Sequence, residues 1–198
     1  MARRLFTTAH KLLLDMSAGA KLRGLTGRVL IVGSGMEHYA EGLPLVSHIV
    51  TTDIIPTPGI SSLADAHKLP FPDCTFDSYV AMEVLEHLKS PEEAATEIWR
   101  VLKPNGTAII SIPFLFRVHG DPDDFQRLTK SGLMELFQRF SSIEITAFGN
   151  RLHVISDLLT TATRYFVGFR LMNHIFRIKL LNIPSQDAPS GYIIKLTK

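Results

Sequence analysis

Cysteine and long apolar runs are scarce in this sequence, and each absence excludes a class of protein. Cys74 is the single cysteine among 198 residues and has no partner for an internal disulfide. A reducing compartment, and hence a cytoplasmic location, is therefore expected. No run of 18 uncharged apolar residues occurs, so the sequence predicts no membrane span.

A strong charge imbalance is also missing, although the basic residues are unevenly distributed. The net charge of +2 does not by itself indicate a nucleic-acid partner. Residues 1–28 and 150–184 are basic and poor in acids, but neither shows the aromatic and basic surface that binds single strands. The sequence therefore does not favour a nucleic-acid partner, and RNA methylation through the basic segments is left as an alternative.

The two basic segments also carry apolar residues near helical spacing. Residues 1–27 are predicted to form an N-terminal helix, and a mitochondrial transit peptide is the alternative. Residues 150–184 are predicted to be a helical insertion. That insertion either roofs an acceptor pocket or lies on anionic lipid as a peripheral membrane contact.

Short apolar runs alternate with helical segments along the chain. The runs are 28–32, 47–52, 77–82, 107–112, 143–148 and 191–198, and helices are predicted near Glu83, from Pro91 to Leu102 and from Ser131 to Phe140. Alternation of this kind predicts an α/β fold with βαβ units and a parallel sheet. Because no repeat or linker interrupts it, residues 1–198 are predicted to form one domain.

The loop after the first strand reads Gly33-Ser34-Gly35, and the second strand ends at Asp53. Ligands of such sheets bind beyond the carboxyl ends of the strands, where an acid like Asp53 accepts both ribose hydroxyls. His38 occupies the position of the third glycine in a dinucleotide fingerprint, which disfavours a diphosphate and therefore NAD. An amino acid joined to a nucleoside needs only the first two glycines.

Three further segments help to identify the protein family that the chain resembles: residues 64–77, 78–88 and 100–106. With the glycine loop and Asp53, this series resembles the class I methyltransferases that use S-adenosylmethionine (SAM), in the type 11 branch acting on small molecules. The resemblance covers residues 28–148 and returns at 191–195. It implies a Rossmann-like, seven-stranded, mostly parallel sheet in the order 3-2-1-4-5-7-6, with helices on both faces and a helical insertion before the last strand.

The resemblance also implies which residues bind SAM. Asp53 would hold the ribose and Asp65 the adenine amino group, and the remaining contacts would come from Gly33, Ser34, Gly35, Ile54, Ala66 and Met82. The sequence departs from the family pattern at Val32, where an acid often precedes the first glycine, and at Met36-Glu37. These departures leave a non-catalytic, SAM-binding accessory or regulatory protein as the alternative function.

Methyl transfer from a sulfonium is an in-line displacement, so the protein mainly aligns the reactants. A base is needed when the acceptor is a hydroxyl or a protonated amine. Glu86 and His87 follow the strand 77–82 and His119 follows the strand 107–112, which makes these three the candidate catalytic residues. Among their neighbours, Phe125 is a candidate pocket wall, and Asp124 and Arg127 either pair with each other or meet a polar acceptor.

The spacing of Glu83, Glu86 and His87 also suggests a metal site, because positions i, i+3 and i+4 share one face of a helix. The pattern is similar to that of ubiquinone-pathway O-methyltransferases and small-RNA 2′-O-methyltransferases, which hold a metal, and His119 would be a fourth ligand. Similar strings occur in this family without a metal, so the prediction includes none. The predicted activity is O- or N-methylation of a small molecule, with a glycan- or lipid-linked acceptor among the candidates.

Overall fold

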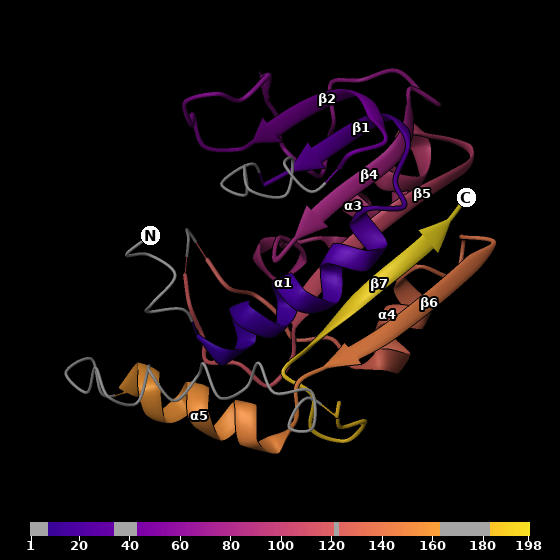
Figure 1. The fold of residues 1–198 in the computed structure, drawn as a ribbon. Coiled ribbons are helices and arrows are strands. Elements are labelled where there is room, and N and C mark those ends of the chain that lie inside the picture. The colour runs from indigo at the N-terminus through magenta and orange to yellow at the C-terminus, as the bar shows by residue number, and fades with distance from the viewer. Residues whose placement is uncertain (1–7, 34–42, 121–122, 163–182) are drawn as a thin grey trace.

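The computed structural model describes residues 8–33, 43–120, 123–162 and 183–198, which form an α/β sandwich around one sheet (Figure 1). The seven strands lie in the order β3-β2-β1-β4-β5-β7-β6. Their bounds are β1 Gly27–Val32, β2 Val46–Asp53, β3 Ser62–Leu63, β4 Phe76–Met82, β5 Leu102–Pro113, β6 Ser142–Phe148 and β7 Gly191–Thr197. The strands from β3 to β5 pair in parallel, whereas β7 pairs antiparallel with β5 and β6. The predicted order is confirmed.

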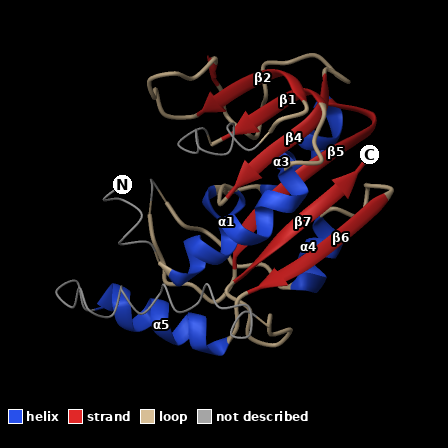
Figure 2. Ribbon diagram, viewed as in Figure 1, coloured by secondary structure: helices blue, strands red, loops and turns tan. Residues whose placement is uncertain are grey.

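Helices cover both faces of the sheet (Figure 2). They are α1 Ala9–Leu22, α3 Pro91–Val101, α4 Lys130–Leu136 and α5 Arg151–Ala162, with a 3-10 turn, η3, at Leu85–His87. In β1, Val29 and Ile31 face α1, while Leu30 and Val32 face the side covered by α3 and α4. Because side chains alternate along a strand, burial on both faces requires the continuous apolar runs seen in the sequence.

The N-terminus of α1 has identifiable capping groups. Thr8 Oγ1 accepts from Lys11 N, and the carboxylate of Asp157 in α5 accepts from the backbone N–H groups of Ala9 and His10 at 2.7 and 2.8 Å. These bonds satisfy orphan donors at the start of α1 and attach α5 to it. In α3, Pro91 occupies the first turn as predicted.

The prediction of a helix near Glu83 is wrong. Glu83 has φ 56°, and only the short turn η3 follows it. The chain does not continue as a helix into Pro91, because helical backbone is disfavoured for the residue before a proline, and Ser90 has the non-helical angles φ −123° and ψ 77°. Glu83, Glu86 and His87 therefore do not share a helix face. Similarly, α4 ends at Leu136 rather than Phe140, with a turn beyond it.

Some predicted features fall outside the described residues: Ser34, Gly35, residues 1–7 and residues 163–182 of the insertion. In the part of the chain that is described, no helix has the length and apolar character needed to cross a membrane. The carboxyl ends of β1, β2 and β4 meet at one edge of the sheet (Figure 1), which is where the site lies.

Candidate active site

A pocket of about 560 Å³ opens at the carboxyl ends of β1, β2 and β4. It lies at the crevice where ligands of open α/β sheets bind. Its lining includes Val32 and Gly33, Asp53 and Ile54, residues 64–67, and residues 82–84 and 87–89 at and beyond the end of β4. His119, Asp123 and Phe125, which follow β5, complete the lining. None of the described residues of α5 lines it.

Two carboxylates occupy the end of the pocket nearest β2. Asp53 Oδ1 accepts from Ile55 N at 3.0 Å in the turn that ends β2. Asp65 Oδ1 accepts from His67 N at 2.9 Å and lies 2.6 Å from His67 Nδ1. These contacts with His67, the backbone bond first, hold the pKa of Asp65 below its usual value, so the carboxylate is ionised at neutral pH.

The centre of the pocket is formed where β1 meets β4. Gly33 has φ +75°, and a Cβ atom there would lie 2.4 Å from Val84 Cγ2. Both the backbone conformation and the close approach therefore require glycine. The neighbouring Met82 ends β4 and is buried, so it contributes a fixed wall to the pocket.

Most of the residues that line this pocket lie in a stretch of the chain that matches a known protein family. Residues 30–110 match the methyltransferase domain family. This stretch of the chain is therefore similar to methyltransferase domains. The match spans β1 to β5 and so includes the strands whose ends form the pocket.

Individual proteins similar to this chain agree with the match. The ubiquinone/menaquinone biosynthesis C-methyltransferase UbiE of Ruegeria sp. is 32% identical over 88 residues, which are 44% of this chain and 30% of that protein. The chain thus spans less than a third of this curated relative. A solved SAM-dependent methyltransferase of Thermotoga maritima, described as a possible histamine N-methyltransferase, superposes with a TM-score of 0.63 at 16% identity, covering 96% and 91% of the two chains.

The fold is shared by proteins of different activity. The [4+2]-cyclase SpnF superposes on this chain with a TM-score of 0.59 at 22% identity, covering 96% of this chain and 80% of SpnF. Because a fold hosts many chemistries, the activity has to be argued from the site residues.

The structure places most of the site residues predicted from the sequence around this one pocket. Its lining includes Gly33, Asp53, Ile54, Asp65, Ala66, Met82, His87 and His119. Glu86 lies behind the lining and is fully buried. Ser34 and Gly35 lie outside the described residues.

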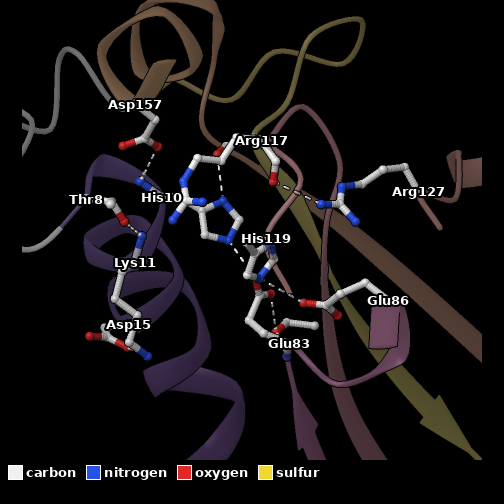
Figure 3. A network of polar contacts seen from close by, with 12 residues as sticks. Thr8, His10, Lys11, Asp15, Glu83, Glu86, Arg117, His119, Arg127 and Asp157 are labelled. Carbon is white, nitrogen blue, oxygen red and sulfur yellow. Dashed lines mark hydrogen bonds and ion pairs between the residues drawn. The ribbon is translucent and has the colours of Figure 1, made fainter. Parts of the chain in front are cut away.

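Two imidazoles face one buried carboxyl group at the far end of the pocket. Oε1 of Glu86 lies 3.6 Å from His87 Nε2 and 3.9 Å from His119 Nε2. The opposite nitrogen of His87 contacts the carbonyl oxygen of Asp123, and His119 Nδ1 lies 3.2 Å from Asp124 Oδ2. Both rings therefore direct Nε2 toward Glu86, and Figure 3 shows this for His119.

The protonation of this cluster follows from its burial. No hydrogen-bond partner among the described residues reaches either carboxylate oxygen of Glu86. Burial, together with the nearby charge of Glu83, raises the pKa of Glu86 well above its usual value. Burial also lowers the pKa of His119. An uncharged carboxyl group beside a neutral imidazole is the result, and a neutral imidazole is a competent general base.

Asp124 and Arg127 pair with each other, with Arg127 Nη2 at 2.7 Å from Asp124 Oδ2. This pair lowers the pKa of Asp124 to about 2. Asp124 also accepts from the backbone N–H of His119 at 2.9 Å. Of the two predicted roles, the internal pair that fixes the loop is the one observed. Phe125 lines the pocket, as expected for a wall.

Sequence reasoning missed one residue of the site, His10. Its Nε2 atom lies 2.7 Å from Glu83 Oε2, although 73 positions separate the two residues in the chain. In the sequence, His10 looks like one more position on the apolar face of a helix. The local signal that could have pointed to this contact is a polar histidine on an apolar helix face, and the structure shows that His10 is buried there.

Proposed function

We propose that this chain transfers a methyl group from SAM to the oxygen or nitrogen of a small-molecule acceptor. The observation that carries the proposal is the composition of one continuous pocket. Carboxylates suited to a nucleoside, Asp53 and Asp65, lie at one end, and the imidazoles of His87 and His119 lie at the other. Gly33 lies between them, where the methionine part of SAM requires close approach to the backbone.

In this proposal Asp53 accepts from the ribose hydroxyls, Asp65 accepts from the adenine amino group, and Ile54 packs on the ring. The donor is already activated, so alignment of acceptor, methyl and sulfur supplies much of the rate. His119 is the proposed base, because its neutral ring takes the acceptor proton as the new bond forms. His87 is the second candidate, and the buried carboxyl group of Glu86 faces the Nε2 atoms of both rings.

Calorimetric titration with SAM, S-adenosylhomocysteine and NAD tests the cofactor. The proposal expects binding of the first two and none of NAD. Turnover is then measured as S-adenosylhomocysteine released with a panel of phenols, catechols, amines and sugars. Binding without turnover on any member would favour the alternative, a SAM-binding protein that does not catalyse methyl transfer.

The same residues offer a second use, because donor atoms of Glu86, His87 and His119 all lie within 4.8 Å of one another. One carboxylate and two imidazoles suit Zn²⁺ or Mn²⁺, which would supply Lewis-acid activation of an acceptor oxygen. The acid–base proposal expects full turnover after exhaustive chelation. Loss of turnover that Mn²⁺ or Zn²⁺ restores would replace it with a metal-assisted reaction.

We further propose that the acceptor is linked to a glycan or a lipid. In α5, the apolar side chains of Leu152, Ile155, Leu158 and Leu159 are exposed. Such a face suits contact with an acyl chain or a lipid surface. Co-sedimentation with vesicles that contain anionic lipid tests the lipid contact. If the protein stays in the supernatant, the proposal is limited to a water-soluble acceptor.

A further inference from the structure

Glu83 follows β4 directly, and its carboxylate is held on both oxygens at the wall of the pocket. Oε1 accepts from Ser111 Oγ at 2.7 Å, and Oε2 lies 2.7 Å from His10 Nε2 (Figure 3). The side chain is 14% exposed. Neither contact uses all the lone pairs of its oxygen, so the carboxylate retains acceptor capacity toward the pocket.

The surroundings of Glu83 fix this position. Its left-handed backbone, at φ 56°, is costly for a residue with a side chain. The backbone N–H donates to Ser111 Oγ at 2.9 Å, which holds the conformation. His10 is fixed in turn, because its Nδ1 lies 2.7 Å from Ser190 Oγ and its ring packs on Phe148 at 5.0 Å between centroids.

The proposed cofactor brings a charge that needs an anionic partner. Its amino-acid end carries an α-ammonium group, yet the residue before Gly33 is the buried Val32. The described acids that line the pocket are Asp53, Asp65, Glu83 and Asp123. Asp53 and Asp65 lie at the adenosine end, and Asp123 lies beside His87. Only Glu83, among these four, adjoins Met82 and the strand pair that positions Gly33.

We propose that the carboxylate of Glu83 binds the α-ammonium group of the methionine moiety of SAM, with His10 and Ser111 as positioning residues. This inference rests on the proposed function, since it assumes that the pocket binds SAM. A charge-assisted hydrogen bond in a partly buried site is the strong kind, so its loss is measurable.

The test compares two ligands that differ by one amino group. Calorimetry is carried out with S-adenosylhomocysteine and with its deaminated analogue, 5′-deoxy-5′-(3-carboxypropylthio)adenosine. The wild-type protein is expected to prefer the aminated ligand by about 10- to 100-fold. Glu83→Gln is expected to remove that preference and to leave the affinity for the analogue unchanged. Ser111→Ala, which frees Oε1, is expected to reduce the preference in part.

Matched variants separate a binding role from a structural one. Glu37→Gln removes an acid that follows the glycine loop in sequence, and the preference is expected to persist in it. Should Glu83→Gln fail to fold, Glu83→Asp keeps the charge but shortens the side chain, and is expected to weaken S-adenosylhomocysteine selectively. A preference unchanged in the Glu83 and Ser111 variants, or lost in Glu37→Gln, overturns the inference. Failure of every protein, including the wild type, to bind either ligand or 5′-methylthioadenosine overturns the proposed function instead.

Discussion

At the scale of single residues, the carboxyl group of Glu86 and the ring of His119 owe their chemistry to burial. Glu86 is fully buried, and no described residue donates a hydrogen bond to its oxygens. His119 is partly buried and its backbone N–H is fixed by Asp124. Burial disfavours the charged form of both groups, so the pKa of the acid rises and the pKa of the imidazole falls.

Glu86→Gln is expected to change the pH dependence of stability. The raised pKa of Glu86 means that its stabilising contribution is present while the group is protonated and is lost as pH rises through the folded-state pKa. Glutamine keeps the shape without the charge. Without metal, the free energy of unfolding of the wild type should therefore fall relative to the variant as pH rises above the usual pKa of a glutamate, by at most about 1.4 kcal/mol for each pH unit.

Denaturant unfolding at several pH values, in the presence of a chelator, measures this difference. Glu92→Gln, on the exposed face of α3, is the matched control and should show no such trend. A wild type that gains stability over the Gln variant as pH rises would mean that Glu86 is ionised in the folded protein.

His119 determines the expected pH profile of the reaction. Because burial lowers the pKa of His119 below its usual 6.5, its base form dominates at neutral pH and is lost only at lower pH. The acidic limb of kcat/KM should therefore have an apparent pKa below 6.5. His119→Gln should reduce kcat by about 10²- to 10⁴-fold and leave SAM affinity unchanged. If His87→Gln alone has this effect, the base is His87.

At the scale of elements, the sequence predicts well what local pattern determines. Continuous apolar runs predict strands such as β1 and β4 because both faces of the sheet are covered. The expected helix at Glu83 is wrong. Pro91 disfavours helical backbone just before it, and Val84 packs closely against Gly33, and these two constraints override the helical spacing of the sequence. The contact of His10 with Glu83 joins distant segments, and no local pattern encodes it.

The junction of α1 with α5 is a second long-range contact, and it has a testable energy. Asp157→Ala removes a buried carboxylate that accepts from two backbone N–H groups at the start of α1. Buried donors without acceptors are costly, so the free energy of unfolding should fall by about 2 kcal/mol. Faster amide exchange at Ala9 and His10 should accompany the loss.

Asp15→Ala is the comparison for this element, because Asp15 forms a half-exposed pair with Lys11 on the same helix. Surface pairs contribute little, so its effect should stay below about 0.5 kcal/mol. Equal effects of the two substitutions would show that Asp157 does not hold α1 and α5 together.

At the scale of the whole molecule, the site assembles only when distant segments come together. Gly33 and Asp53 precede the carboxyl end of β4 in the chain, and His119 follows β5. The order of the sheet, predicted from the family resemblance, brings these ends to one edge. The protonation of Glu86 and the anchoring of Glu83 depend on burial and on α1, so they follow from the three-dimensional structure rather than from the motif.

Because the ligand would contact several strand ends at once, its binding should stabilise the entire fold. S-adenosylhomocysteine at 100 times its Kd should add about 2.7 kcal/mol to the free energy of unfolding. For a domain of this size, that corresponds to a rise in Tm of roughly 5–10 °C. Differential scanning fluorimetry measures it, with NAD as the negative control. Asp65→Asn, which weakens the proposed adenine contact, should reduce the shift. An equal shift with NAD, or none with S-adenosylhomocysteine, would show that the pocket is not built for an adenosine joined to an amino acid.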